Sequence, residues 1–424
     1  MKTTRRKLLL AAGAGFLAAP AIIARAEEKA TLRISQGGPN FLKMLAELKR
    51  QFDAADNTAT VEFVADGDNW DPLLQNTLRE AVIGDLPDAT WQSLTYAPLL
   101  ARRGLAQPLD TLAAETKDLE ALGITRPLAE ATMLNGKIHA VPFGTTIPVV
   151  YYNMDLLRKA GYKSAALPKT WDEIIAAGKQ VAALDPKING GYIEYASTNA
   201  WMFQNLLASH GGRMMQPGEG DIAFDGAEGL KSLEVLWKFG EINKIAMTTE
   251  QSRQAFNAGV SGIQVRTASG IGAVAKAATG HFELQIGEFP IPAANGRMVG
   301  AGHGFIMFTK DPRRQEAFTR FARFAAGPAG QSILAGNSGY LPVNTNLLND
   351  SKFVAEYFQK NPFHRPVIER LGITGDQYSF PSDNTVKIVD MISEEMRQVL
   401  AHQTEPADAL KAMSDQTRRL LQKA

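Results

Sequence analysis

Residues 136–162 of the chain read GKIHAVPFGTTIPVVYYNMDLLRKAGY. The centre of this stretch, Val149-Val150-Tyr151-Tyr152, is a run of β-branched and aromatic residues, which predicts a strand. Similar short runs occur on both sides of it, at residues 31–35, 60–64, 89–91, 262–266 and 304–308. We expect a strand at each of them.

Helical patterns lie between these runs. Asp71-Pro72 is expected to start one helix, because a capping residue followed by proline is a favoured start. Thr170 is expected to start another, with Glu173 placed to complete a capping box. Apolar residues spaced three or four apart predict buried stripes on two further helices, with Phe41, Leu45, Leu48 and Phe52 in residues 41–53 and Leu230, Leu233 and Trp237 in residues 228–241.

The order of these elements predicts the fold class. Strands that alternate with helices are typical of a mainly parallel sheet covered on both faces, so the class is α/β. Residues 383–423 are expected to be almost entirely helical. In such folds ligands bind in loops at the carboxyl ends of the strands.

The first 26 residues have the pattern of an export signal. A basic start is followed by an apolar run from Leu8 to Ala19 and by Ala24-Arg25-Ala26, after which cleavage is expected. Thr4 to Leu9 resembles the twin-arginine signal, and a general secretory signal with two arginines is the alternative. No later segment has the roughly 18 uninterrupted apolar residues of a spanning helix, so we expect a soluble mature protein.

The net charge and the cysteine content of the chain limit the partners and attachments that it can have. The chain has 45 basic and 44 acidic residues, and residues 1–26 hold five of the basic ones and no acid, which leaves 40 against 44, a net charge of −4. A weakly acidic body is a poor partner for nucleic acid. The chain has no cysteine, which excludes disulfides and a lipid anchor. We expect a monomer free in the periplasm of a Gram-negative cell.

Motifs for catalysis are nearly lacking. The sequence has no Gly-x-Ser-x-Gly, no His-Glu-x-x-His and no Walker loop, and its six histidines are scattered, so neither a structural metal nor a cofactor is expected. Residues 270–275 match Gly-x-Gly-x-x-Ala, but the acidic residue expected about 20 positions later is not evident. A helix N-terminus facing a cleft is the simpler interpretation. Paired carboxylates of a glycosidase could still meet in space.

Four loops that follow strands are rich in small polar and aromatic residues: 36–40, 65–70, 92–96 and 267–270. Neutral hydrogen-bonding groups together with aromatic faces are what a sugar needs, because its hydroxyls require partners and its C–H faces stack on rings. Gln36, Asn69, Gln92 and Ser93 are candidates by loop position alone.

The opening stretch also carries a family resemblance. Residues 136–143, 148–157 and 160–161, followed by 168–173 and 338–343, resemble the extracellular solute-binding proteins of ABC importers, the carbohydrate-binding family 1. Sugar and glycerol-3-phosphate periplasmic binding proteins are similar. The resemblance implies a bilobal, type II periplasmic-binding-protein fold, with two α/β lobes that close by a hinge. Lobe 1 would hold residues 27–145 and 298–327 and lobe 2 residues 146–297 and 328–424, with crossings near 144–147, 295–299 and 325–328.

The resemblance also implies ligand-binding positions. These are the hinge hydroxyls of Thr145 and Thr146, the aromatic rings of Trp70, Trp201 and Tyr340, and hydrogen-bonding groups at Ser269, Gly302 and His303. A structural role is the alternative for each of them. Trp171 and Trp237 are expected to be packing residues.

The resulting hypothesis is a non-enzymatic binding protein that delivers a mono- or oligosaccharide, or a related polyol, to the permease subunits of an ABC transporter in the inner membrane. A second hypothesis is an anionic sugar derivative (a sugar acid, or a sulfonated or phosphorylated glycoside) bound by Arg266, whose planar guanidinium suits an oxyanion. The alternative for Arg266 is an ion pair between the lobes or at the surface. Residues 378–384 lack the arginine of phosphate-type relatives, which disfavours a phosphodiester. A periplasmic glycosidase is a third hypothesis.

Overall fold

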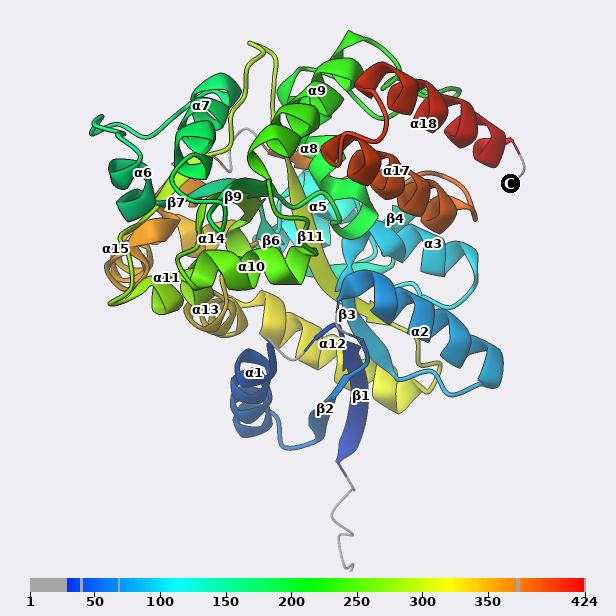
Figure 1. Ribbon diagram of the computed structural model, residues 1–424. Coiled ribbons are helices and arrows are strands. Elements are labelled where there is room, and N and C mark those ends of the chain that lie inside the picture. Colours follow the sequence, from blue (N-terminus) through cyan, green and yellow to red (C-terminus); the bar gives the residue numbers. More distant parts are fainter. Residues whose placement is uncertain (1–28, 39–40, 68, 369, 371–373, 423–424) are drawn as a thin grey trace, which may run out of the picture.

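The computed structural model describes residues 29–38, 41–67, 69–368, 370 and 374–422 (Figure 1). The predicted export signal, residues 1–26, lies outside the described residues, as do Pro39 and Asn40 of the first predicted ligand loop. Among the residues that are described, no helix combines the length and the apolar character needed to cross a membrane.

Two mixed β-sheets organise the described part of the chain. The larger has seven strands in the order β12-β6-β11-β3-β1-β2, with β13 paired to β11, and the smaller has four in the order β10-β7-β9-β8. The strands of the larger sheet are β1 (Ala30–Gln36), β2 (Ala59–Ala65), β3 (Ala89–Ser93), β6 (Ala140–Thr146), β11 (Met298–Met307), β12 (Leu341–Pro342) and β13 (Thr374–Asp376). Those of the smaller are β7 (Pro148–Asn153), β8 (Asn189–Ile193), β9 (Ser261–Thr267) and β10 (Leu284–Glu288), and β4 (Met133–Leu134) and β5 (Lys137–Ile138) form a separate pair.

All six predicted strands are present, but the expected mainly parallel pairing is wrong. β1 pairs in parallel with β2 and β3, and β8 with β9, whereas β11 is antiparallel to β3 and β6, and β7 is antiparallel to β9 and β10. The reason is topological. β6 and β11 bring the chain into and out of the smaller sheet, so their direction is set by the crossing and not by a βαβ unit.

Helices cover both faces of the larger sheet. On one face, Phe143 and Phe305 of the sheet pack with Phe318 and Phe321 in a core that includes side chains of α1, α12 and α13. On the other face, Ile306 packs with Leu74 and Leu99 of α2 and α3. The helices with this sheet are α1 (Leu42–Ala55), α2 (Trp70–Ile83), α3 (Ala97–Arg102), α4 (Thr116–Ala121), α5 (Arg126–Glu130), α12 (Pro312–Ala326), α13 (Pro328–Asn337) and α14 (Thr345–Leu348).

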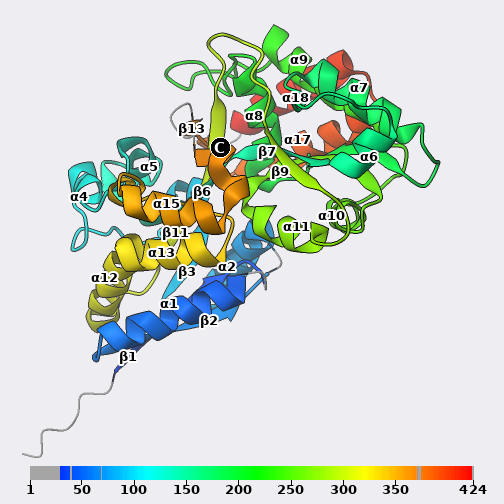
Figure 2. The same ribbon diagram turned by 90° about the vertical axis from the view of Figure 1, so that its left-hand side faces the viewer.

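The smaller sheet has its own core. Tyr151, Tyr152, Phe203 and Phe239 are buried in it together with side chains of the two C-terminal helices. The helices here are α6 (Met154–Lys159), α7 (Trp171–Ala182), α8 (Trp201–Ser209), α9 (Ala227–Ile242), α10 (Thr249–Asn257), α11 (Ile271–Ala278), α17 (Thr385–Leu400) and α18 (Pro406–Leu421), while α15 (Ser351–Lys360) and α16 (Arg365–Ile368) lie on the path between the two sheets. Figure 2 shows the two sheets with their helices as two neighbouring bodies.

The helix starts follow from the local sequence. The Thr170 capping box of α7 is confirmed, because the Glu173 amide donates to the Thr170 hydroxyl and the Glu173 carboxylate accepts from the Thr170 amide. α2 begins two residues earlier than Asp71-Pro72 predicts, at Trp70, with Asn69 in place of Asp71 as its capping residue. In α9, Leu233 is buried as expected, whereas Leu230 and Trp237 are only partly buried.

The chain passes between the sheets at two of the expected places. β6 ends at Thr146 and β7 starts at Pro148, and the return follows β10 and precedes β11. It does not change sheets at 325–328, because α12 and α13 meet there and Ile333 and Leu334 pack in the same core as Phe321. After α13, Leu341, Val367 of α16 and Phe380 already pack in the second core, ahead of Ile388 of α17. The exact limits of the two lobes stay a prediction.

Candidate functional site

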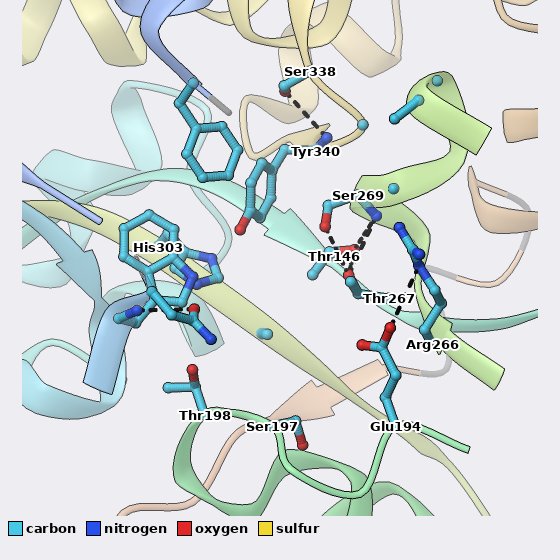
Figure 3. A pocket seen from close by; sticks show the side chains of 18 of the residues that line it. Thr146, Glu194, Ser197, Thr198, Arg266, Thr267, Ser269, His303, Ser338 and Tyr340 are labelled. Carbon is cyan, nitrogen blue, oxygen red and sulfur yellow. Dashed lines mark hydrogen bonds and ion pairs between the residues drawn. The ribbon is translucent and has the colours of Figure 1, made fainter. Parts of the chain in front are cut away.

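A cavity of about 700 Å³ lies where the loops of the two sheets face each other (Figure 3). The larger sheet contributes the starts of α1 and α2, the middle of β11 and residues 336–340. The smaller sheet contributes residues 194–202, one side of α10, and the end of β9 with the start of α11. The cavity volume is in the range of sites for small organic molecules.

One wall of the cavity is aromatic and neutral. The Trp70 and His303 rings lie 4.4 Å apart, His303 and Tyr340 5.0 Å, and Phe41 stacks on Trp70 at 5.7 Å, measured between ring centroids. Burial lowers the pKa of His303 to about 3, so this ring is uncharged at neutral pH. Burial raises the pKa of Tyr340, which keeps its hydroxyl protonated. The wall therefore offers flat apolar faces with a few neutral polar atoms.

Local contacts hold Trp70 in this wall. The Asn69 side chain accepts a hydrogen bond from the Trp70 amide and so starts α2 at this residue. Gln92, at the end of β3, donates from Nε2 to the Trp70 carbonyl oxygen at 3.1 Å. The end of β3 and the start of α2 thus hold the Trp70 backbone on both sides. This favours a preformed site over one that the ligand must order.

The floor of the cavity is the first crossing between the sheets. The Thr146 and Thr267 hydroxyls are 2.8 Å apart, and the Ser269 amide donates to the Thr146 hydroxyl at 3.1 Å. The Ala268 amide donates to the carbonyl oxygen of Ile147 at 2.9 Å. These bonds tie the end of β6 to the end of β9. The Thr146 hydroxyl is already engaged within the protein.

The opposite wall is charged. Glu194 is buried after β8 and accepts two hydrogen bonds of 2.8 Å from Nε and Nη2 of Arg253 on α10. Arg266, at the end of β9, is also buried, and its Nε lies 3.7 Å from Glu194 Oε1. The Arg266 guanidinium lies 5.3 Å from the centre of the Tyr151 ring. One carboxylate therefore faces two guanidinium groups.

Gly270 permits the position of Arg266. A Cβ atom at residue 270 would lie 2.0 Å from Arg266 Nη2, closer than any side chain allows. The two glycines of the Gly-x-Gly-x-x-Ala match differ in this respect. A Cβ on Gly272 would have nothing within 4 Å, so only Gly270 is needed to make room for Arg266. Gly270, Gly272 and Ala273 line the cavity, so the start of α11 faces it, as the simpler interpretation of the motif predicts.

Trp201 stands at the edge of the cavity at the start of α8. Its Nε1 donates to the Val299 carbonyl oxygen at 2.7 Å. The two residues before it, Asn199 and Ala200, have φ values of 56° and 51°. Two successive non-glycine residues in the left-handed region are costly and persist only where the surroundings hold them. The turn that presents Trp201 is therefore strained and fixed by tertiary contacts.

Eight of the predicted site residues line the cavity: Asn69, Trp70, Thr146, Trp201, Arg266, Ser269, His303 and Tyr340. Their role toward a ligand remains a prediction. Trp171 packs against Phe239 and Phe289, and Trp237 stacks on His402, as packing residues do.

Five predicted residues do not line the cavity, namely Gln36, Gln92, Ser93, Thr145 and Gly302. Gln36 is fully buried at the end of β1, and Gln92 is bonded to Trp70 and to the Ser93 amide. The Ser93 hydroxyl is 2.9 Å from that of Thr95. Thr145 and Gly302 are paired with each other in the sheet, where a Cβ on Gly302 would meet Leu94 at 2.8 Å.

Four residues that line the cavity are not among the site residues predicted from the sequence: Phe41, Glu194, Arg253 and Lys276. Glu194 follows β8, and β8 is parallel to β9, so the rule that ligands gather at the carboxyl ends of strands identifies it once β8 is known. Arg253 and Lys276 have no local signal, because a cation on a helix is most often a solvated surface residue.

The described residues contain no cluster of three His, Asp or Glu side chains that could hold a metal ion. The charged groups of the cavity can instead bind a ligand directly, through the guanidinium groups and the aromatic rings. Nothing in the described arrangement of Glu194, Arg253 and Arg266 resembles a nucleophile held by a base.

Residues 43–362 match the family model of bacterial extracellular solute-binding proteins. The sn-glycerol-3-phosphate-binding periplasmic protein UgpB of Agrobacterium fabrum is 25% identical over 295 residues, which is 65% of each chain, so this chain spans just under two thirds of the length of that relative.

Two solved structures share the fold. An ABC substrate-binding protein from Listeria monocytogenes in complex with cycloalternan has a TM-score of 0.79 at 18% identity, with 92% of this chain and 99% of that chain covered. UgpB from Mycobacterium tuberculosis in complex with glycerophosphocholine has a TM-score of 0.78 at 18% identity, with 92% and 98% covered. The bilobal, type II periplasmic-binding-protein fold is thereby confirmed.

Proposed function

The chain belongs to the bacterial extracellular solute-binding proteins, and we propose that it binds a mono- or oligosaccharide, or a related polyol, and delivers it to the permease subunits of an ABC importer. The single observation that carries this proposal is the cavity, because both sheets line it and an aromatic wall faces a hydrogen-bonding wall across it. Aromatic rings take the C–H faces of a sugar, and the polar wall takes its hydroxyls.

We further propose that the ligand leaves the cavity chemically unchanged. The protein would act in the periplasm as a monomer, after an export signal has been removed behind Ala26. For the lobes, we propose that the first one extends through residue 348, because Ile333, Leu334 and Val343 pack in its core, and that the second takes the C-terminal helices.

A thermal-shift screen of the chain from Glu27 onward against sugars and polyols tests the proposed function. A ligand at a hundred times its dissociation constant adds about 2.7 kcal/mol to the unfolding free energy, which gives a clear rise in Tm. Trp201→Ala should remove the shift, and Trp237→Ala, far from the cavity on α9, should keep it.

Recovery of the ligand after incubation separates transport from hydrolysis. We expect each oligosaccharide to be returned intact. Cleaved products would favour the glycosidase hypothesis, and a screen in which no sugar, polyol or derivative shifts the melting curve would contradict the proposed function.

A further inference from the structure

The charge of the cavity differs in sign from that of the chain after the signal. Beyond residue 26 the chain has 40 basic and 44 acidic residues. The ionisable groups that line the cavity include four cations, Lys43, Arg253, Arg266 and Lys276, and two carboxylates, those of Glu194 and Glu250. The cavity lining is therefore net positive by two, within an acidic body. A field of this sign concentrates anions in the cleft.

Within this lining, Arg266 is the most deeply buried cation, and its ion pair with Glu194 is long. Its side chain is only 8% exposed, so water contributes little to its solvation. Glu194 already accepts both of its short hydrogen bonds from Arg253, and Arg266 Nε, at 3.7 Å, is beyond hydrogen-bond distance of that carboxylate. Arg266 Nη1 reaches Gln264 at 3.4 Å, and Nε has no hydrogen-bond partner among the described residues.

The positive charge of Arg266 is only partly balanced, because Glu194 is shared with Arg253. A buried cation needs both a charge partner and hydrogen bonds. The guanidinium also lies against Gly270, at the start of α11, where the helix dipole places further positive charge. An oxyanion beside Arg266 would satisfy the free N–H and would interact favourably with the helix end.

The aromatic wall, on the other side of the cavity from Arg266, determines which kind of ligand skeleton fits. Trp70, His303 and Tyr340 present rings and carry no net charge at neutral pH, with the pKa of His303 held at about 3 by burial. His303 Nδ1 is buried with no hydrogen-bond partner in the part of the chain that is described. This wall suits a carbon skeleton with hydroxyl groups and offers nothing to a second charge.

From these observations we propose, on the basis of the proposed function, that the ligand is a polyhydroxylated compound with a single oxyanion group, that Arg266 binds this group, and that the carbon skeleton stacks on the aromatic wall. Carboxylate, sulfonate and phosphate share the chemistry that a guanidinium recognises. Glu194 and Arg253 act as a neutral pair that positions the Arg266 side chain without neutralising it.

Titration calorimetry with sugars that differ only at C6 tests this inference. The probes are D-glucose, D-glucuronate, 6-deoxy-6-sulfo-D-glucose and D-glucose 6-phosphate, with the same comparison for galactose and for glycerol against sn-glycerol 3-phosphate. Sulfate and inorganic phosphate alone test whether the oxyanion suffices. We expect at least one anionic member to bind ten times more tightly than its neutral partner, with affinity that falls as NaCl is raised.

Variants assign the effect to Arg266. Arg266→Gln should reduce the affinity for the anion at least tenfold more than the affinity for its neutral partner, and Arg266→Lys should retain part of the preference because it keeps the charge. Arg50→Gln, which removes an exposed arginine of α1 that is paired with Glu47, is the matched control and should behave as the wild type. Circular dichroism and the ligand-free Tm check that each variant is folded.

The outcomes separate this inference from the function on which it rests. If neutral members bind as tightly as their anionic partners, or if Arg266→Gln keeps the anion preference, the inference is wrong and the proposed function stands. If sulfate or phosphate alone binds as tightly as every sugar anion, the proposed stacking of the ligand skeleton on the aromatic wall is wrong. If no probe of either charge binds, both proposals fail.

Discussion

Gly270 determines how closely the Arg266 guanidinium lies against α11. Because a Cβ at residue 270 would lie 2.0 Å from Arg266 Nη2, Gly270→Ala must displace the guanidinium. We expect at least a tenfold loss of affinity for the ligand found in the screen, with about 1 kcal/mol or less change in the unfolding free energy, since the nearest atoms to the new Cβ all belong to the long, flexible Arg266 side chain. Calorimetry and urea unfolding measure the two effects.

Gly272→Ala is the matched control for that prediction. It lies two residues further along the same helix, and its Cβ would have nothing within 4 Å. Its affinity should equal that of the wild type. Equal losses in both variants would mean that the close contact with Arg266 has no role in binding.

Asp71 makes the stability of the protein depend on pH. Burial raises its pKa from 3.8 to about 6, with a further contribution from Asp390 on α17 and in spite of a hydrogen bond of 2.5 Å from the Tyr96 hydroxyl. Between these two pH values the folded chain holds a proton that the unfolded chain has released, so the unfolding free energy falls as pH rises from about 4 to 6.

Asp71→Asn should remove this loss. The amide oxygen still accepts the Tyr96 hydrogen bond, so at pH 7.5 the variant should be more stable than the wild type by on the order of 1–3 kcal/mol, and at pH 3.5 the difference should vanish. Urea unfolding at the two pH values measures it. Asp155→Asn, in the first turn of α6 and exposed, should show no such gain; a gain of the same size there would contradict the role of burial.

Roles of single residues were only partly readable from the sequence. Gln92 has the composition of a ligand-binding loop residue, yet both of its polar atoms are used by the protein, one on the Trp70 carbonyl oxygen and one on the Ser93 amide. A side chain that can bind a sugar can also bind the backbone, and only the neighbours decide which it does.

At the scale of elements, the start of α7 is set by four residues. Thr170→Ala removes the hydroxyl that accepts from the Glu173 amide, and we expect a loss of about 1 kcal/mol in the unfolding free energy. Thr279→Ala, at the C-terminal end of α11, removes no N-terminal cap and should cost less than about 0.5 kcal/mol. Similar losses in both variants would show that the capping box contributes nothing specific.

Some elements could not be predicted from local pattern. β6 contains Pro142 and Gly144, and β11 contains Gly300, Gly302 and Gly304, residues that are depleted in strands. Both strands are nevertheless central and fully buried. Their glycines admit neighbouring side chains, as Gly144 does for Leu334 and Gly304 for Leu94. Packing between elements therefore outweighed propensity.

At the scale of the whole molecule, Gly339 is the point where the two halves of the cavity come together. A Cβ at residue 339 would lie 2.2 Å from the Ser269 carbonyl oxygen, which belongs to the other wall. Gly339→Ala should therefore hold the two walls apart and reduce the affinity for the ligand tenfold or more. With ligand bound, the variant should have a larger radius of gyration than the wild type. X-ray scattering measures the last effect.

Gly336→Ala is the control for this closure. It lies three residues earlier and near the same cavity, and its Cβ would have nothing within 4 Å. It should close and bind as the wild type does. A ligand-bound Gly339→Ala variant as compact as the wild type would show that this contact does not limit closure.

The sequence by itself determined the α/β class, six strands, the capping of α7 and membership of the solute-binding family. These features depend on residues a few positions apart or on a contiguous pattern, and propensity and periodicity act over such distances.

Only the tertiary structure decided which loops share one cavity, that Glu194 binds Arg253 while Arg266 Nε has no hydrogen bond to any described residue, and that Gly339 meets Ser269. Each of these contacts joins residues that are some 60 to 70 or more positions apart. They form because the side chains of two sheets must pack without voids, and no local preference of the chain encodes which partners that packing selects.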